Sequence, residues 1–347
     1  MPLVMPEKLH RLIVALYEHA GVKPEDARVI AEHQVASNLA GHDSHGVHLL
    51  PTYLDRIKKG HIVPDAPYEI VNETPTTARV DGHWGFGQVV STRAMALCIA
   101  KARQHQVGIV SVFRQSHVGR LGDYPLMAAR VGLVSMMMCD SGQNPKVVAP
   151  FGGRASRLGT NPISIAFPSD LEAPILIDMA TSAVAGNKIN LAVTRKTKVP
   201  SGWILDKHGK PTTNPEDYAA GGMILPLGGA EGHKGYALSF AVETLAAILP
   251  GLGFGVDPQK RHNDGAFLFV FDPGAFRPLV EFKADVTAFA EYLKATPAAE
   301  GFTEVLYPGE IEFRTEQRRR KEGIPVEDAT WDKLDALARD AGVAHLL

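Results

Sequence analysis

Cysteine is almost absent from this sequence. Cys98 and Cys139 are the only two, and each lies inside an apolar segment. Two isolated cysteines do not make a disulfide framework, so we expect buried free thiols in a reducing compartment. Long hydrophobic runs are also lacking, because none approaches the ~18 residues of a membrane span. Residues 1–35 show no signal-peptide pattern. These absences predict a cytoplasmic protein without a membrane partner.

An excess of charge of either sign is missing as well. The chain has 36 lysine and arginine residues against 38 aspartate and glutamate residues, which gives a net charge of -2. A balance this close to neutral argues against binding nucleic acid or a membrane surface through bulk electrostatics. Hydrophobic content of 45% in 347 residues supplies a sizeable core. The length allows roughly two or three packed units.

Motifs that would identify several common enzyme classes are not found. No Gly-x-Gly-x-x-Gly follows a predicted strand, and the glycine run from Gly251 to Gly255 follows a helix instead. This argues against a Rossmann dinucleotide site. There is no Walker loop, no HExxH helix and no paired-cysteine metal site. A Gly-x-Ser-x-Gly elbow is also missing, which weakens an α/β-hydrolase interpretation.

What the sequence does contain is a change of pattern along the chain. Apolar residues at helical spacing predict that the first 60 residues are helical. Strand and helix patterns then alternate, which predicts an α/β sandwich with a partly parallel sheet. We expect loops with short strands at 183–232 and helices again from Thr287. The predicted strands are 77–80, 107–113, 133–139, 163–167, 175–177 and 267–271, and the predicted helices between them are 88–104, 124–130 and 236–248.

The first candidate for chemistry is a loop rich in histidine. The stretch AGHDSHGVH places His42, His45 and His48 beside Asp43 and Ser44. Histidine can give and take a proton near neutral pH, so convergent imidazoles indicate acid–base chemistry. The alternative is a solvated helix start, with Asp43 as its N-cap and the imidazoles idle. A second, similar cluster downstream favours chemistry.

The second cluster reads QSHVGR and contains His117 directly after a predicted strand. Ligands gather at the carboxyl ends of strands in parallel α/β sheets, so His117 is well placed to be functional. The alternative is a loop histidine held by backbone hydrogen bonds.

Three further features lie in the second half of the chain. Asp178 ends a strand, where it could orient an imidazole, accept from a ribose hydroxyl or cap a helix. His233 and Lys234 open an apolar helix, where backbone amides and a cation make an anion site. The basic run at 318–321 predicts a solvated helix face.

Six short motifs follow one another along the chain. They are AGHDSHG at 40–46, SHVGR at 116–120, GTNP at 159–162, DMATSA at 178–183, HKGYAL at 233–238 and YPGE at 307–310. Taken together and in this order, they resemble the malate/L-lactate/ureidoglycolate dehydrogenase family, and most closely its hydroxycarboxylate dehydrogenase B branch. The resemblance covers about residue 6 to 340 and implies a nicotinamide-binding α/β fold that is not Rossmann, with a central mixed sheet flanked by helices. We expect a helical domain from residues 1–66 with 310–347, and a cofactor-binding region at 67–309.

The resemblance also implies a reaction and its catalytic residues. The reaction is hydride transfer between NADH or NADPH and a 2-oxo acid, in a homodimer with active sites between the subunits. His45 becomes the expected proton donor to the substrate carbonyl oxygen, with Ser44 beside it. His117 matches the histidine proposed as acid/base in ureidoglycolate-type members, so which imidazole transfers the proton stays open. Asp178 is expected to hold His45 in one tautomer and to stabilise its cation.

Further residues match positions that line the nicotinamide cofactor in the family, together with His45. They lie after the second histidine cluster, around the DMATSA motif, at the HKG helix start and in the YPGE turn. No metal ligand is implied. The residues are Gly119, Arg120, Leu121, Ile177, Asp178, Met179, Ala180, Thr181, Ser182, His233, Lys234, Asn263, Tyr307, Pro308, Gly309 and Glu310.

One position departs from the family pattern. Many members carry an arginine four residues after the catalytic histidine, where it grips the substrate carboxylate, and here that position is Leu49. An arginine–carboxylate fork is bidentate and hard to imitate. Either His48 or Arg120 takes over, or the substrate presents an apolar group there. We therefore expect a 2-oxo acid with an apolar or aromatic side chain.

Two other functions remain open from the sequence. Some relatives reduce a cyclic imine acid, and this chain could do the same. A metal-dependent hydrolase or lyase could instead use His45, His48 and His117 as ligands. That function would need a further ligand at metal spacing, which the sequence does not show.

Overall fold

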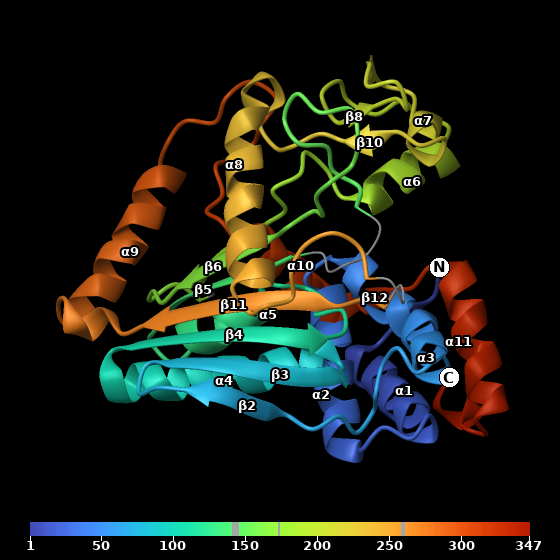
Figure 1. Ribbon diagram of the computed structural model, residues 1–347, viewed down its shortest axis with the longest axis horizontal. Coiled ribbons are helices and arrows are strands. Elements are labelled where there is room, and N and C mark those ends of the chain that lie inside the picture. Colours follow the sequence, from blue (N-terminus) through green and yellow to red (C-terminus); the bar gives the residue numbers. More distant parts are fainter. Residues whose placement is uncertain (141–145, 173, 258–260) are drawn as a thin grey trace.

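A seven-stranded sheet forms the centre of the computed structural model, which describes residues 1–140, 146–172, 174–257 and 261–347. The strands run in the order β2–β3–β4–β11–β5–β6–β7 (Figure 1). β3 and β4 pair in parallel, and the other neighbours pair antiparallel. The predicted mixed α/β sheet is therefore confirmed, with a single parallel pair among its described strands. The bounds are β2 (Glu69–Glu73), β3 (Thr77–Gly85), β4 (Val107–Gln115), β5 (Val134–Cys139), β6 (Ile163–Phe167), β7 (Ile175–Met179) and β11 (Asp264–Phe271).

Helices cover both faces of this sheet (Figure 1). Successive side chains of a strand point to opposite faces, so β11 contributes side chains to the packing on both faces of the sheet. Leu268 is buried with apolar residues of α4 and α5, whereas Phe267 packs with residues of α8 and of the π-helical turn η4 that follows it. These helices are α4 (Gly87–His105), α5 (Asp123–Ala129), α8 (Gly232–Val242) and η4 (Glu243–Ile248).

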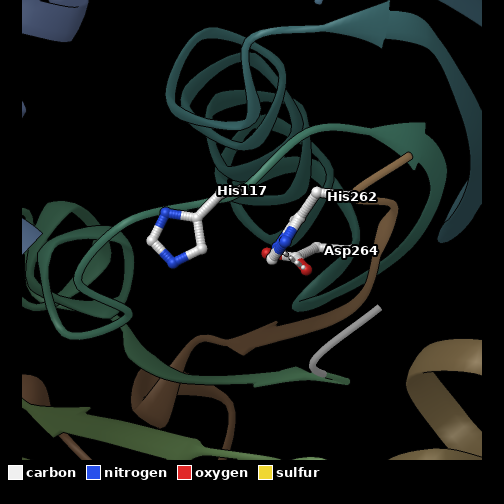
Figure 2. Close-up of side chains that lie close together, drawn as sticks. All are labelled: His117, His262 and Asp264. Atoms are coloured by element: carbon white, nitrogen blue, oxygen red, sulfur yellow. Dashed lines mark ion pairs between the residues drawn. The ribbon is translucent and has the colours of Figure 1, made fainter. Parts of the chain in front are cut away.

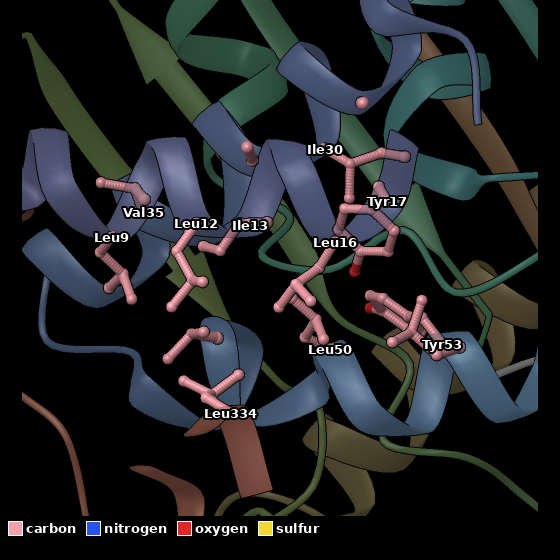
Figure 3. Packing of buried hydrophobic residues seen from close by; sticks show 14 of the residues in the cluster. Leu9, Leu12, Ile13, Leu16, Tyr17, Ile30, Val35, Leu50, Tyr53 and Leu334 are labelled. Carbon is pink, nitrogen blue, oxygen red and sulfur yellow. The ribbon is translucent and has the colours of Figure 1, made fainter. Parts of the chain in front are cut away.

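The two ends of the chain pack together beside the sheet. In α1, Leu9, Leu12 and Leu16 are buried at helical spacing, and they share one core with α2, α3 and α11 (Figure 3). Strands β1 and β12 pair antiparallel, so both termini lie in this region (Figure 1). The predicted domain boundaries at 66/67 and 309/310 stay a prediction. The elements are β1 (Leu3–Val4), α1 (Pro6–His19), α2 (Pro24–Leu39), α3 (Leu50–Lys58), α10 (Glu310–Glu322), β12 (Ile324–Pro325), α11 (Asp328–Asp340) and η6 (Ala344–Leu346).

Some elements differ from the sequence prediction, for identifiable reasons. β2 consists of exposed residues, so no buried face marks it in the sequence. The region 183–232 contains the expected short strands but also α6, which buries Ile189 alone. α9 begins ahead of Thr287 and buries Ala290 alone, which leaves little apolar periodicity. The bounds are α6 (Gly186–Thr194), β8 (Ile204–Leu205), β9 (Pro211–Thr212), α7 (Glu216–Ala219), β10 (Met223–Ile224), η3 (Gly229–Glu231), η5 (Pro273–Ala275) and α9 (Leu279–Lys294).

The helix predicted at 236–248 also differs in its form. It begins earlier, at Gly232, and its last turns are π-helical from Glu243 onward. Short π segments are frequent at functional sites. No helix in the described ranges is long and apolar enough to cross a membrane.

Candidate active site

His45 lies in a loop whose conformation is stabilised by the side chain of Asn38. The Asn38 side chain donates to Asp43 Oδ1 (2.7 Å) and accepts from the backbone N–H of Val47 (2.9 Å). A Cβ at Gly46 would lie 2.1 Å from Asn38 Oδ1, so glycine is needed for this close approach. Asp43 lies inside the first turn of this loop and its carboxylate accepts hydrogen bonds from side chains, so the predicted N-cap role of Asp43 is wrong. The loop consists of two 3-10 turns, η1 (Asp43–His45) and η2 (Val47–Leu49).

A second anchor reaches this loop from α10. Arg319 donates from both terminal nitrogens to the Asp43 carboxylate, at 2.6 and 3.0 Å, and also to the Asn38 carbonyl. Its side chain is 12% exposed, so the prediction of a solvated helix face is wrong for this residue. The prediction holds for Arg320, which pairs with Glu316 at the surface. The Arg319 contact joins both ends of the chain, which local sequence patterns do not report.

His117 follows β4, as expected, and its ring stacks on the ring of His45. The ring centroids are 5.7 Å apart and the ring planes differ by 12°. Ser44 Oγ lies 3.1 Å from His45 Nδ1. The structure thus brings together the two histidine clusters, including three of the residues that the family resemblance makes catalytic.

Both imidazoles are desolvated, which favours their neutral forms. Burial lowers the pKa of His45 to about 4, and the nearby His42 acts in the same direction. Burial, followed by the neighbouring His262, holds the pKa of His117 well below its ordinary value. A negative partner, such as the carboxylate of a bound acid, would raise both pKa values.

Tyr53 of α3 is a site residue that the sequence analysis missed. Its hydroxyl lies 2.6 Å from His117 Nδ1 and accepts from Gln88 Nε2 at 3.0 Å. In the sequence, Tyr53 shares a helix face with Leu50 and Leu54, so it looks like an ordinary core residue. No local signal separates a tyrosine that only packs from one whose hydroxyl reaches a distant loop.

His262 and Asp264 complete the surroundings of His117 (Figure 2). The His262 ring lies edge-on to the His117 ring, with centroids 5.1 Å apart and planes 80° apart. His262 Nε2 is 2.6 Å from Asp264 Oδ1, and Asp264 Oδ2 accepts from the Val118 backbone N–H at 3.0 Å. Sequence reasoning missed both residues because they lie at the start of a strand, outside any motif.

The same three side chains could hold a metal ion. One ligand atom from each of His117, His262 and Asp264 lies within 4.8 Å of the others. Two imidazoles and one carboxylate are a donor set that zinc accepts. This set differs from the one predicted for a metal-dependent enzyme, because His48 is exposed and lies outside the group.

Asp178, at the end of β7, does not meet His45. Its Oδ2 accepts from the Gly122 backbone N–H at 3.0 Å and lies 3.7 Å from Arg120 Nε. Arg120 in turn donates to Asp123 at 2.9 Å. Burial raises the pKa of Asp178, and the charge of Arg120 opposes this shift. Within the described ranges no bond joins Asp178 to His45, so this carboxylate holds the loop after the second histidine cluster instead.

The end of β7 leads directly to the start of α8. The predicted cofactor residues 177–182 continue the strand, and the Thr181 carbonyl accepts from the Leu227 backbone N–H at 2.9 Å. Leu227 lies against Gly235 in the first turn of α8, where a Cβ would be 2.3 Å from the Leu227 carbonyl oxygen. The DMATSA and HKG segments, far apart in the sequence, are therefore neighbours in space.

The turn at 307–310 also contacts β7. The Pro308 carbonyl accepts from the Leu176 backbone N–H at 3.1 Å. Gly309 has a φ of +94° and lies where a Cβ would be 3.0 Å from Leu176, so this turn requires glycine. Glu310 then begins α10 and pairs with Lys294.

Two observations bear on whether a nicotinamide cofactor fits here. Asn263 is 2% exposed, and its buried Oδ1 has no hydrogen-bond partner among the residues that the structure describes, which fits an amide donor such as the carboxamide of nicotinamide. His233 and Lys234 are 53% and 70% exposed at the start of α8, with Glu231 at 3.7 and 3.3 Å. Backbone N–H groups and a cation at a helix start fit a phosphate.

Comparisons with known proteins identify the family of the chain. A sequence profile of the malate/L-lactate dehydrogenase family matches residues 4–335. The L-sulfolactate dehydrogenase of Methanocaldococcus jannaschii is 37% identical over 347 residues, 98% of both chains. Hydroxycarboxylate dehydrogenase B of Escherichia coli K12 is 36% identical over 342 residues, 97% of this chain and 94% of the other. The solved structure of malate dehydrogenase from Entamoeba histolytica has a TM-score of 0.94 at 32% identity, and covers 99% of this chain and 98% of the other.

The fold and the comparisons define an oxidoreductase of the hydroxy-acid dehydrogenase class. The chain belongs to the malate/L-lactate dehydrogenase family, which confirms the resemblance seen in its motifs.

Proposed function

We propose that this protein transfers a hydride reversibly between NADH or NADPH and a 2-oxo acid. The observation that carries the proposal is the stacked pair of desolvated imidazoles, His45 and His117. The His117 ring also packs edge-on against His262, and the next residue, Asn263, has a buried side-chain oxygen with no hydrogen-bond partner among the described residues. Acid–base groups and a receptor for a carboxamide thus lie on contacting segments. When bound, the cofactor supplies the hydride, and the protein has to supply a proton and hold the acid.

Asn263 would accept from the carboxamide of the cofactor, and the end of β7 would line it. The amides at the start of α8, with Lys234, would hold its phosphates. Gly119 to Leu121, residues 177–182 and the turn at 307–310 would line the cofactor from three elements. The contacts between these elements, described above, support a shared role.

The proton is assigned to His45. Its neutral form dominates in the empty site because burial lowers its pKa to about 4. The carboxylate of a bound 2-oxo acid would raise that pKa, since an opposite charge nearby favours the cation. As the carbonyl carbon accepts the hydride, the electron pair of the C=O bond moves to oxygen, which takes the proton from His45. Ser44 orients this ring through Nδ1.

Arg120 is the better of the two replacements for the missing arginine at Leu49. His48 is exposed, whereas the Arg120 side chain is 5% exposed and its charge reaches His45, whose pKa it helps to lower. Leu49 itself is half-buried against the core of the terminal helices. The part of the Leu49 side chain that stays exposed is apolar, which supports a substrate with an apolar or aromatic side chain.

A second copy of the chain is the proposed partner. Exposed apolar side chains gather on α8 and α9, and monomeric proteins rarely leave such faces uncovered. Sedimentation analysis should give a homodimer, and a stable monomer at micromolar concentration would contradict it. The buried free thiols Cys98 and Cys139 support a reducing, cytoplasmic compartment. The exposed side chains are Leu238, Phe240, Val280, Phe289 and Tyr292.

The test of the reaction is a fluorescence titration with NADH and with NADPH, followed by a panel of 2-oxo acids and a cyclic imine acid. We expect binding of one reduced cofactor and its oxidation by a 2-oxo acid. Turnover of the cyclic imine acid alone would replace the proposed substrate class. Lack of binding by either cofactor would contradict the proposal.

A metal-dependent reaction is the second candidate, and the group of His117, His262 and Asp264 favours it. The two candidates differ in their response to a chelator, because only the metal-dependent reaction should stop when the metal is removed.

A further inference from the structure

Gln88, Tyr53 and His117 form a chain of hydrogen bonds that runs from α4 through α3 to the active-site loop. Gln88 Nε2 donates to the Tyr53 oxygen (3.0 Å), and that oxygen lies 2.6 Å from His117 Nδ1. The side chains of Gln88 and Tyr53 are fully buried, with exposures of 0% and 1%. Water does not compete there, so each donor needs an acceptor within the chain of bonds.

The direction of these bonds determines where His117 carries its proton. A tyrosine hydroxyl can accept hydrogen bonds and has one proton to donate. Because the Tyr53 oxygen accepts from Gln88, its own proton is directed to His117 Nδ1, which must then be an acceptor. A neutral imidazole that accepts at Nδ1 has its proton on Nε2. Among the described residues no hydrogen bond involves Nε2, so this N–H is available to a ligand.

We infer that Tyr53, oriented by Gln88, is a positioning residue that holds His117 as the Nε2–H tautomer and aims this N–H at the carbonyl oxygen of the substrate. The inference rests on the proposed function, because it places His117 against the substrate. His117 then polarises the carbonyl as a neutral hydrogen-bond donor, while His45 delivers the proton. Neutral imidazoles serve as electrophiles in this way in other enzymes. The opposite tautomer would present a lone pair to the carbonyl oxygen and repel it.

Tyr17 provides a control, because it is a buried tyrosine of the same core and no contact joins it to His117 among the described residues. Both tyrosines are fully buried in the same core (Figure 3) and both pack edge-on against Phe86, at 5.6 Å for Tyr17 and 6.3 Å for Tyr53. The Tyr17 hydroxyl donates to Gln34 Oε1 at 3.2 Å. Replacement of either tyrosine by phenylalanine removes one buried hydroxyl, so a purely structural role predicts similar effects.

The tautomer can be measured without any enzymatic assay. Two-bond proton–nitrogen correlation spectra of protein labelled with 15N-histidine distinguish the two neutral forms, and a His117→Gln variant identifies the His117 signals. We expect the Nε2–H form in the native protein and in Tyr17→Phe. Tyr53→Phe and Gln88→Leu should both show a mixture of tautomers. A proton on Nδ1 of His117 in the native protein would overturn the inference.

Kinetics supply the second readout. Tyr53→Phe should lower kcat roughly 10- to 100-fold, the range expected when a catalytic group loses its orientation, with KM for the oxo acid much less affected. Tyr17→Phe should keep the native kcat. Native kcat and a native His117 tautomer in Tyr53→Phe would also overturn the inference.

Failure of the proposed function would look different from failure of this inference. The native enzyme would then turn over no 2-oxo acid, while the spectra would still decide whether Tyr53 sets the tautomer. If Tyr53→Phe does not fold, the native spectrum and Gln88→Leu decide the question by the same criteria.

Discussion

Arg319 binds both carboxylate oxygens of Asp43, although the two residues are 276 positions apart in the chain. The same guanidinium donates to the carbonyl of Asn38, whose side chain holds the other end of the histidine loop. Helix α10, in the C-terminal segment of the chain, thus supports the loop that carries His45. This arrangement makes the C-terminal segment part of the active-site scaffold.

Arg319→Ala should therefore affect both stability and catalysis. Loss of a charge-assisted pair between the largely buried Arg319 and the half-exposed Asp43 should lower the free energy of unfolding by roughly 1 kcal/mol. It should also lower kcat, because His45 loses its support. Arg320→Ala is the control, since its pair with Glu316 is exposed and contributes at most about 0.5 kcal/mol. Urea unfolding and initial rates measure both effects, and equal effects of the two variants would contradict the assigned role of Arg319.

The lowered pKa of His45 predicts a pH dependence of stability. Its pKa of about 4 in the folded protein lies below the ordinary value of 6.5. Between these values the unfolded chain binds more protons, so the free energy of unfolding rises with pH. This contribution is complete above about pH 6.5 and is lost as the pH falls toward about 4. His45→Gln should flatten the slope measured by denaturant unfolding across this window. The same slope in both proteins would show that His45 is not buried as described.

The sequence could predict those parts of the site that occupy contiguous motifs. His45, His117 and the start of α8 each stand in a short polar segment beside an apolar element, and the structure places them at such junctions. The glycines at 46, 235 and 309 could be predicted in the same way. Each allows a close approach to its backbone that a side chain would prevent, so the glycine itself is the local signal.

Contacts between segments that are far apart in the sequence have no such local signal. Tyr53 follows the apolar periodicity of its helix, and Arg319 follows the charge pattern of its own helix. Asp178 was expected to hold His45 because the family resemblance implied this pairing. In the structure the Asp178 carboxylate instead accepts from the Gly122 backbone N–H and pairs with Arg120. Such pairings depend on the three-dimensional packing of whole elements, which local patterns do not encode.

Lys234 at the start of α8 should contribute to cofactor binding. Lys234→Ala removes a cation from a helix start where backbone amides already favour phosphate. Because the side chain is 70% exposed, we expect a modest loss of roughly three- to tenfold in affinity, which is about 0.7–1.4 kcal/mol. Fluorescence titration with NADH and NADPH measures this, and Lys58→Ala, an exposed lysine of α3, serves as the control. Unchanged affinity in Lys234→Ala would remove this helix start from the cofactor site.

Activity should not depend on a metal ion. The proposed mechanism polarises the carbonyl with imidazole groups and needs no Lewis acid. Protein stripped with a chelator and assayed in metal-free buffer should keep its rate. If activity does require a metal, the group of His117, His262 and Asp264 is the expected binding site. If chelation abolishes activity, zinc restores it and His262→Ala prevents the restoration, the metal-dependent candidate becomes the better description.

Substrate choice should follow from Leu49. Replacement of a guanidinium by an isobutyl group removes up to five donors and adds an apolar wall. A second carboxylate facing that wall would be desolvated without a partner, at a cost of roughly 1–3 kcal/mol. A phenyl or alkyl group would instead gain about 25 cal/mol for each Å² covered. We therefore expect phenylpyruvate-like or branched 2-oxo acids to have a higher kcat/KM than oxaloacetate.

Leu49→Arg tests this directly, with Leu49→Met as a control that keeps the volume and the apolar character of the side chain. The arginine variant should narrow or reverse the preference, because it restores a bidentate partner for a small acidic substrate. The methionine variant should keep the native order of substrates. Leu49 is half-buried against the helical core, so the urea stability of both variants has to be measured alongside kcat/KM. A native preference for oxaloacetate of tenfold, about 1.4 kcal/mol, would mean that Leu49 does not face the substrate.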